Sequence, residues 1–300
     1  MTRNIHPVIN IFLGLLRPFI YANFWVAGAV WALTRLTEFQ LTQWWQAGTL
    51  DEYGHFLLNS SFAGLNAAGT LIVYGFARLF DYPGEDGLQS KISQWRSAMP
   101  KTAQLSMGLG ISYVAVWWAL HGSWNLLYLY AGAIAVAALY PLPFILRKSG
   151  GGLRSIPGLK LVVVAAVWAY VTAVIPCVHA GTFTIGVFFE RFWWTAALTL
   201  PFDVRDMIVD QGSIRTLPHM IGPRNTVWLA NLMLWFSFYI QVQLFQITLA
   251  YTLAYTFGLY LLCSIIIVLA NPKLGDLYYS LLIEGLPFLL LGLWVLSAYL

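Results

Sequence analysis

Long apolar runs are the feature that most restricts what this chain can fold into. A helix that crosses a bilayer needs about 20 mostly apolar residues, because lipid offers no hydrogen-bond partner to backbone N–H and C=O groups. We count nine runs of about this length, at residues 8–33, 55–80, 103–121, 124–146, 159–178, 182–201, 225–245, 248–270 and 277–299. They predict an all-α integral membrane protein of nine transmembrane helices, with residues 1–300 forming a single transmembrane domain.

The composition excludes several other classes of protein. Only 9% of the residues are charged and 59% are hydrophobic, whereas about a quarter of a soluble protein is charged. A disordered chain and a soluble nucleic-acid-binding protein are therefore excluded, despite the net charge of +4. The two cysteines, Cys177 and Cys263, lie inside apolar runs without metal-type spacing, which excludes a disulfide scaffold and predicts small buried side chains.

The basic residues predict the orientation in the membrane. Of the 16 Lys and Arg residues, 13 precede the first run or follow the even-numbered runs, and Arg35 lies on the opposite side. Cytoplasmic loops carry such an excess of basic residues. We therefore expect a multi-pass protein of a bacterial inner membrane, with its N-terminus in the cytoplasm and its C-terminus on the opposite side.

The acidic residues form two clusters on the predicted cytoplasmic face, four spans apart. In a bundle of two similar halves, these clusters would converge over one cavity. Asp81, Glu85 and Asp86 follow the second run, and Asp203, Asp206 and Asp210 follow the sixth.

The spacing of the second cluster favours a divalent cation. Asp203, Asp206 and Asp210 are spaced i, i+3, i+7, so on a continuing helix they share one face and repel each other. Mg²⁺ relieves such repulsion, and it completes its shell with water and substrate phosphate oxygens. The alternative is a solvated interfacial helix whose acids face water.

Arginines stand beside both acidic clusters. Arg78 precedes the first cluster, Arg205 lies within the second, and Arg215 follows it. Guanidinium groups beside carboxylate-bound Mg²⁺ suit a diphosphate, whose charge the metal and the arginines would share. The competing explanation is the cytoplasmic excess of basic residues, which needs no ligand.

Two further acids lie inside predicted spans. Glu190 adjoins Arg191 in the sixth run, and Glu284 lies near the cytoplasmic start of the ninth. An ionisable residue inside the membrane is costly unless it is paired or hydrated. We therefore expect an ion pair between Glu190 and Arg191, and we expect Glu284 to face the adjoining loop.

The second cluster also resembles a motif of the UbiA superfamily of intramembrane prenyltransferases. Residues 202–210 read Phe-Asp-Val-Arg-Asp-Met-Ile-Val-Asp, and residues 214–218 read Ile-Arg-Thr-Leu-Pro. They are similar to the family's pattern Asn/Asp-x-x-Arg-Asp-x-x-x-Asp followed by Arg/Lys-Thr-Leu-Pro. Residues 16–18 and 156–160, Leu-Arg-Pro and Ile-Pro-Gly-Leu-Lys, are similar to other segments of the family. The resemblance covers nearly the whole chain and implies a nine-helix bundle with a central cavity that opens near the cytoplasmic face.

The first cluster departs from the family's pattern Asn-x-x-x-Asp. Asp81 and Glu85 are present, but Ala77 stands where the family has Asn. A second alignment sets residues 74–79 against Tyr-Asn-Phe-Asp-Arg-Leu, and then both metal-binding positions are lost. In the family's Tyr-x-x-x-Lys element Tyr140 fits, but Phe144 takes the place of Lys.

The resemblance implies an activity and a site. The activity is a Mg²⁺-dependent transfer of an isoprenoid chain from a prenyl diphosphate to an aromatic or lipid acceptor, with release of pyrophosphate. Asp81, Asp206 and Asp210 would be catalytic. The implied metal ligands are Asp203, Asp206, Asp210, Asp81 and Glu85, and the implied diphosphate-binding residues are Arg78, Arg205, Arg215, Lys160 and Tyr140.

Three other functions stay open at this point. A terpene cyclase of the same family would ionise the diphosphate and let the chain react with itself. A UbiA-fold protein could also bind isoprenoids without catalysis. A transporter or lipid-binding membrane protein belongs to a different class. That reading predicts interrupted helices with charges near the bilayer midplane, whereas most acids here gather at one rim. The acceptor, the chain length and the oligomeric state are left open.

Overall fold

The computed structural model describes residues 16–46, 62–77, 100–140, 158–207, 216–245 and 250–297. Within these ranges the regular structure is helical throughout, which confirms the predicted all-α class. Each of the nine predicted runs contains helix in the described part of the chain. In chain order the elements are α2 (Phe24–Gln46), α4 (Phe62–Ala77), α6 (Pro100–His121), α7 (Trp124–Leu139), α8 (Leu159–Ala169), the π-helical η3 (Tyr170–Val174), α9 (Ile175–His179), α10 (Ile185–Asp206), α11 (Leu217–Ile221), α12 (Pro223–Leu244), α13 (Ala250–Val268), the π-helical η4 (Tyr278–Ile283) and α14 (Leu286–Ser297).

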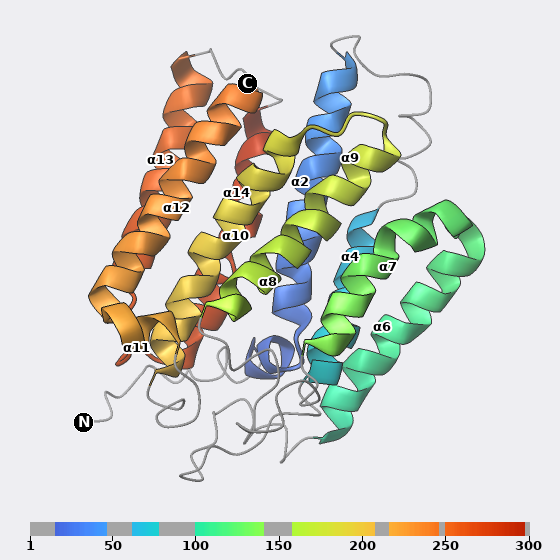
Figure 1. Cartoon of the computed structure of the whole chain (residues 1–300), viewed down its shortest axis with the longest axis horizontal. Helices are drawn as coiled ribbons and strands as arrows, with labels where there is room; N and C mark the ends of the chain where they lie inside the picture. The colour runs from blue at the N-terminus through green and yellow to red at the C-terminus, as the bar shows by residue number, and fades with distance from the viewer. Residues whose placement is uncertain are drawn as a thin grey trace.

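The helices pack side by side in one bundle (Figure 1). Helix α10 packs against α8 and α12, and α2 packs against α4 and α14. Helix α6 contacts α4, and α13 contacts both α12 and α14. The largest hydrophobic core includes Leu36, Trp194, Leu234, Tyr260 and Ile283, which come from α2, α10, α12, α13 and η4. Segments distant in sequence therefore share one core.

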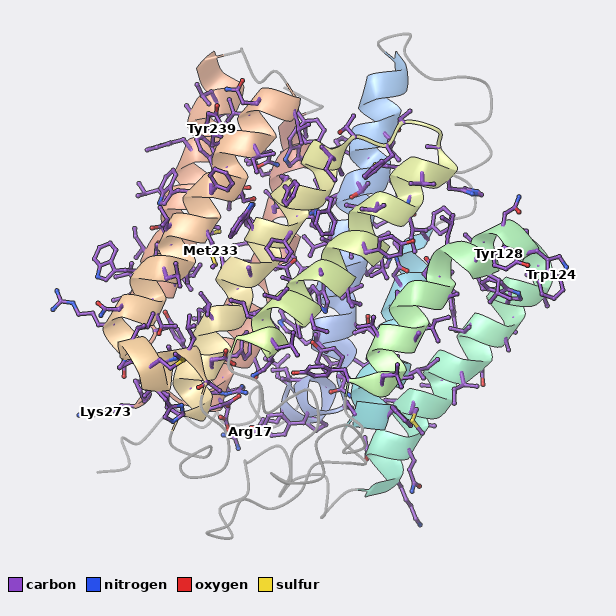
Figure 2. All side chains as sticks on the ribbon, in the orientation of Figure 1. Arg17, Trp124, Tyr128, Met233, Tyr239 and Lys273 are labelled. Atoms are coloured by element: carbon purple, nitrogen blue, oxygen red, sulfur yellow. The ribbon has the colours of Figure 1, made fainter. Side chains whose placement is uncertain are left out.

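The surface and several helices have the character of a membrane protein. Within the described ranges, three helical segments are long and apolar enough to cross a bilayer: Leu159–His179, Pro223–Leu244 and Tyr278–Leu296. Shorter apolar helices occupy Phe62–Ala77, Trp124–Leu139 and Leu253–Val268. Large apolar side chains also point outward, including Leu120, which is 72% exposed, and Trp124, which is 75% exposed (Figure 2). Lipid favours such a surface and water does not. The crossing by all nine helices remains a prediction.

The first helix differs from the predicted run 8–33. Residues 16–21 are helical, the chain turns at Asn23 with φ +70°, and α2 then continues to Gln46. Because the predicted run ends at residue 33 and the next begins at residue 55, Glu38 was expected to lie in the intervening loop on the outer side. That expectation was wrong, because Glu38 is a buried residue of α2. Its Oε2 lies 2.6 Å from Nη1 of Arg35, and its Oε1 accepts a hydrogen bond of 3.2 Å from the Ala63 N–H. A carboxylate with such partners can be buried.

Asn66 links three helical segments inside the bundle. Its Nδ2 donates 2.7 Å to the Val171 carbonyl in η3, and its Oδ1 accepts 2.7 Å from the Tyr130 hydroxyl of α7. A π-helical turn disturbs the regular ladder of backbone hydrogen bonds. The Asn66 amide of α4 therefore supplies a partner at the point where the fifth predicted span changes from α-helix to π-helix.

The sixth predicted run continues further than its apolar residues indicate. Helix α10 extends past residue 201 and ends at Asp206, with Pro201 inside it. Its end lies at the lower end of the bundle in Figure 1, where α8 begins and α4 and α7 end. Arg17 and Lys273 lie at the same end (Figure 2). The fold therefore gathers Asp203, Asp206 and basic side chains at one end.

Candidate functional site

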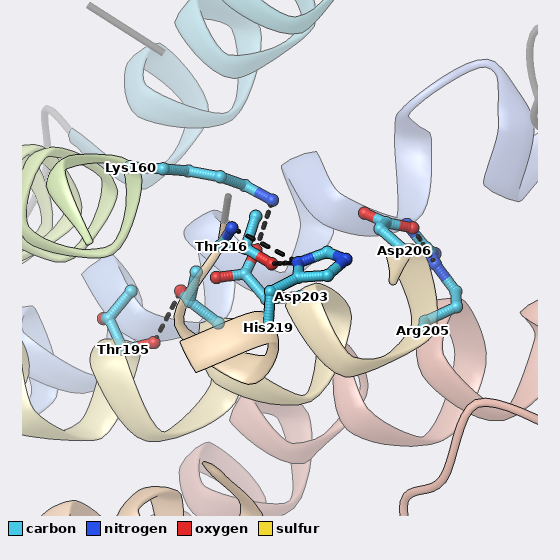
Figure 3. A network of polar contacts seen from close by, with 8 residues as sticks. Lys160, Thr195, Asp203, Arg205, Asp206, Thr216 and His219 are labelled. Atoms are coloured by element: carbon cyan, nitrogen blue, oxygen red, sulfur yellow. Dashed lines mark hydrogen bonds and ion pairs between the residues drawn. The ribbon is translucent and has the colours of Figure 1, made fainter. Parts of the chain in front are cut away.

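Asp203 and Lys160 form an ion pair between α10 and α8. The Lys160 Nζ lies 2.5 Å from Oδ1 of Asp203, and Asp203 is only 3% exposed (Figure 3). Gly158, with φ +76°, a conformation that favours glycine, is the N-cap of α8, and Lys160 follows in the first turn of that helix. A buried carboxylate is destabilising without a cation. Lys160 therefore neutralises Asp203 in this structure.

Asp206 forms a second ion pair with its neighbour Arg205. Nε of Arg205 lies 2.7 Å from Oδ1 of Asp206, and Nη2 lies 3.2 Å from Oδ2, so the pair is bidentate. The guanidinium also lies over the Phe202 ring at 5.0 Å and the Tyr279 ring at 5.8 Å. Its Nη1 is 3.5 Å from Oγ of Ser280. These contacts fix Arg205 between α10 and η4.

Two more acids act on Arg205. Burial lowers its pKa, but the charge and hydrogen bonds of Asp206 outweigh burial, and the charges of Asp276 and Glu284 add to the increase. The pKa of Arg205 is therefore raised. The guanidinium is a fixed positive charge with three carboxylates around it. Asp276 and Glu284 were not predicted as site residues, because they follow α13 and no motif joins them to Asp206.

The Thr-Leu-Pro part of the motif begins a short helix beside the ion pairs. Thr216 is the N-cap of α11 in a capping box with His219, and its N–H donates 3.3 Å to Nδ1 of His219. Pro218 lies in the first turn, where a missing N–H costs little. Figure 3 shows Thr216 and His219 next to Asp203. Helix α11 therefore begins at a capped N-terminus and contacts α10.

The predicted site residues divide into those that the structure describes and those that it does not. Asp203, Arg205, Asp206 and Lys160 come together at the end of α10. Tyr140 is the C-cap of α7, at the same end of the bundle, where its N–H donates 2.9 Å to the Val136 carbonyl. Ala77 is the last residue of α4. Arg78, Asp81, Glu85, Asp210 and Arg215 lie outside the described residues.

The carboxylates at the end of α10 are of the chemical kind that binds Mg²⁺. Among those residues no group of three or more His, Cys, Asp or Glu side chains could hold a metal ion. Mg²⁺ is often held by one or two carboxylates, with water and phosphate oxygens as further ligands. Asp203 and Asp206 have that chemistry, and each is bound to a cation. The site described here is thus two carboxylates and two cations.

Sequence reasoning missed the aromatic and hydroxyl groups around Arg205. Phe202 adjoins the motif, so the sequence itself indicates that this ring lies near Arg205. Tyr279 and Ser280 lie more than 70 residues away, and only the packing of η4 on α10 brings them to Arg205. They carry no sequence signal.

Comparison with known proteins supports the fold. No family model and no curated protein matches the sequence. The structure is similar to that of a UbiA homolog from Archaeoglobus fulgidus bound to GPP and Mg²⁺, with a TM-score of 0.57 and 13% identity. The match covers 96% of this chain and 99% of that chain. At this identity the similarity shows the fold alone, and the protein therefore has the fold of the UbiA superfamily.

Proposed function

We propose that the protein is a Mg²⁺-dependent membrane prenyltransferase. It transfers an isoprenoid chain from a prenyl diphosphate to an aromatic or lipid acceptor and releases pyrophosphate. The supporting observation is the group of two carboxylates and two cations at one end of an apolar bundle. The similar structure from Archaeoglobus fulgidus contains GPP, a prenyl diphosphate, and Mg²⁺.

The ion pairs provide groups of both signs for this reaction. Lys160 and Arg205 are the donors that bind diphosphate oxygens, and in doing so they release the carboxylates of Asp203 and Asp206. These carboxylates would hold Mg²⁺, and we extend the ligand set to Asp81, Glu85 and Asp210 outside the described residues. Bound Mg²⁺ supplies Lewis-acid stabilisation to the leaving pyrophosphate.

The aromatic rings beside Arg205 suit the organic part of the substrate. Loss of pyrophosphate leaves an allylic cation, which π-faces stabilise in a dry pocket. The faces of Phe202 and Tyr279 already accept the Arg205 guanidinium. We assign these two rings to the reacting end of the chain, and the apolar interior to its tail.

The proposal includes an orientation in the membrane. All nine helices cross the bilayer, residues 1–300 form one domain, and a central cavity opens near the cytoplasmic face. Asp203 and Asp206 then lie at the inner surface of a bacterial inner membrane, with the N-terminus in the cytoplasm. Arg17 and Lys273 support this orientation, because they lie at the same end of the bundle as the ion pairs (Figure 2).

A second candidate function follows from Ala77. It ends α4 with a methyl group at the position where the related motif has an Asn. A site with fewer metal ligands favours a terpene cyclase of divergent chemistry, or a UbiA-fold protein that binds isoprenoids without reaction.

Product analysis tests these alternatives. The purified protein is incubated with Mg²⁺, prenyl diphosphates of several lengths and a membrane-lipid extract, and pyrophosphate and products are followed by mass spectrometry. We expect a prenylated acceptor that disappears when Mg²⁺ is chelated. A hydrocarbon or alcohol formed without acceptor indicates a cyclase, and bound diphosphate without pyrophosphate release contradicts catalysis.

A further inference from the structure

Arg205 needs support from outside its own ion pair if it is to bind a diphosphate. Its Nε and Nη2 donate to the two carboxylate oxygens of Asp206, at 2.7 and 3.2 Å (Figure 3). The proposed function requires Asp206 to release these N–H groups, and the present inference rests on that proposal. Once the carboxylate has left, the other contacts of the guanidinium decide where it lies.

Those other contacts include two residues of η4, which is distant from Arg205 in the chain. Cζ of Arg205 lies over the Tyr279 ring, 5.8 Å from its centroid, and Nη1 donates 3.5 Å to Oγ of Ser280. The Phe202 ring makes a similar contact at 5.0 Å, but Phe202 precedes Arg205 by three residues on α10 and is part of the same helix. Tyr279 and Ser280 therefore hold Arg205 against a second element.

Tyr279 is itself held at both ends of its side chain. The residue is 0% exposed, and its ring centroid lies 6.0 Å from that of Phe202. Its hydroxyl donates 2.7 Å to the backbone carbonyl of Asn271. To turn away from the guanidinium, the ring would have to break this hydrogen bond, which is costly for a buried hydroxyl. The position of the ring is therefore fixed by the segment that precedes η4.

The kind of contact suits a supporting role. An aromatic ring attracts a cation through its face, and a guanidinium has five N–H groups for hydrogen bonds. Nε and Nη2 of Arg205 donate to Asp206, so the contact with Tyr279 does not depend on the N–H groups that Asp206 would release. Asp276, three residues before Tyr279, adds a negative charge that acts on Arg205. Both features retain the cation and leave its donors available to phosphate oxygens.

We propose that Tyr279 is a positioning residue, which holds the Arg205 guanidinium in place for the diphosphate when Asp206 releases it. The ring supplies the attraction, and the hydrogen bond to Asn271 fixes the ring. Tyr279 acts on the diphosphate through Arg205. Loss of the Tyr279 side chain should therefore weaken diphosphate binding only in a protein that has Arg205.

Binding of inorganic pyrophosphate isolates this role, because pyrophosphate has no prenyl chain that could contact the ring. It is measured by equilibrium dialysis on the full chain in detergent with Mg²⁺. Tyr279→Leu removes the ring and the hydroxyl and should weaken binding about tenfold, and Tyr279→Phe removes the hydroxyl alone and should weaken it about threefold. Tyr278→Phe is the matched control and should bind like wild type, because the Tyr278 hydroxyl also donates to a backbone carbonyl, that of Ile266. Equal weakening by Tyr278→Phe, or unchanged binding by Tyr279→Leu, overturns the inference.

A double-variant cycle separates positioning from a general loss of structure. Arg205→Gln removes the guanidinium, and the addition of Tyr279→Leu to it should cause no further loss of binding, because the effect of Tyr279 passes through Arg205. A further loss of the same size as in the wild-type background overturns the inference. Unfolding midpoints are measured for each variant, and if Tyr279→Leu does not fold, the comparison of Tyr279→Phe with Tyr278→Phe decides. A wild-type protein that binds no pyrophosphate contradicts the proposed function as well, whereas binding that both Tyr279 variants leave unchanged contradicts the positioning role alone.

Discussion

The Nζ atom of Lys160 lies 2.5 Å from Oδ1 of Asp203, and this contact joins the first turn of α8 to the last turn of α10. The two residues are 43 positions apart. Lys160 was predicted to bind diphosphate, and Asp203 was predicted to bind the metal. Because they bind each other in this structure, part of the candidate site also connects two helices.

Lys160→Gln is expected to affect both stability and substrate binding. It leaves the nearly buried Asp203 carboxylate without a cation, which should lower the free energy of unfolding by about 2 kcal/mol, less than for a fully buried pair because the Lys160 side chain is 25% exposed. The KM for prenyl diphosphate should rise. Thermal unfolding in detergent and steady-state kinetics measure the two effects. Lys273→Gln removes an exposed cation at the same end of the bundle and should change neither, and an unchanged Lys160→Gln protein would contradict the role of the pair.

Asp206→Asn is expected to remove Mg²⁺-dependent pyrophosphate release. The amide oxygen can still accept from Arg205, so the fold should persist, while a negatively charged metal ligand is lost. We expect a rate at least about 100-fold lower, the scale typical of a lost charge-stabilising group. Asp276→Asn is the matched control, because it removes another charge that acts on Arg205 outside the motif. Equal losses in both variants would indicate that the charge around Arg205 matters rather than ligation by Asp206.

Arg191→Met should strongly destabilise the bundle. It leaves the buried Glu190 carboxylate without its cation, for which we expect a loss of about 3 kcal/mol in the free energy of unfolding. The double substitution of Glu190→Gln with Arg191→Met removes both charges and should recover most of that loss. The measurement is the unfolding midpoint of each variant in the same detergent. A double variant no more stable than Arg191→Met would show that the two charges are not coupled.

Gly110→Ala should loosen the contact between α4 and α6. A Cβ atom at this position would lie 2.7 Å from the Ala68 carbonyl oxygen, so the two helices would have to separate. Gly108→Ala, on the same helix, meets nothing within 4 Å and should leave stability unchanged or raise it by up to about 1 kcal/mol through helix propensity. Thermal unfolding of both variants tests the difference. Equal unfolding midpoints would mean that the close approach of α4 to α6 at Gly110 does not contribute to stability.

The sequence alone determined the helical class, the order of the helices and the residues of the second acidic cluster. These follow from local properties, because an apolar run of sufficient length must form a helix in lipid, and a helix of known period sets which residues share a face. For this reason the spacing of Asp203 and Asp206 along a helix could be taken from the sequence. The expected ion pair of the adjacent residues Glu190 and Arg191 was confirmed.

Only the tertiary structure decided which polar residues are buried and what they contact. Glu38 was predicted to lie in a loop because it follows the apolar run 8–33, but Ala63 and Arg35 supply its partners inside the bundle. Likewise, no local pattern joins Lys160 to Asp203 or Tyr279 to Arg205. The physical reason is that a buried charge is stable only beside groups that neutralise or bind it, and here most of those groups come from helices that are distant in the chain.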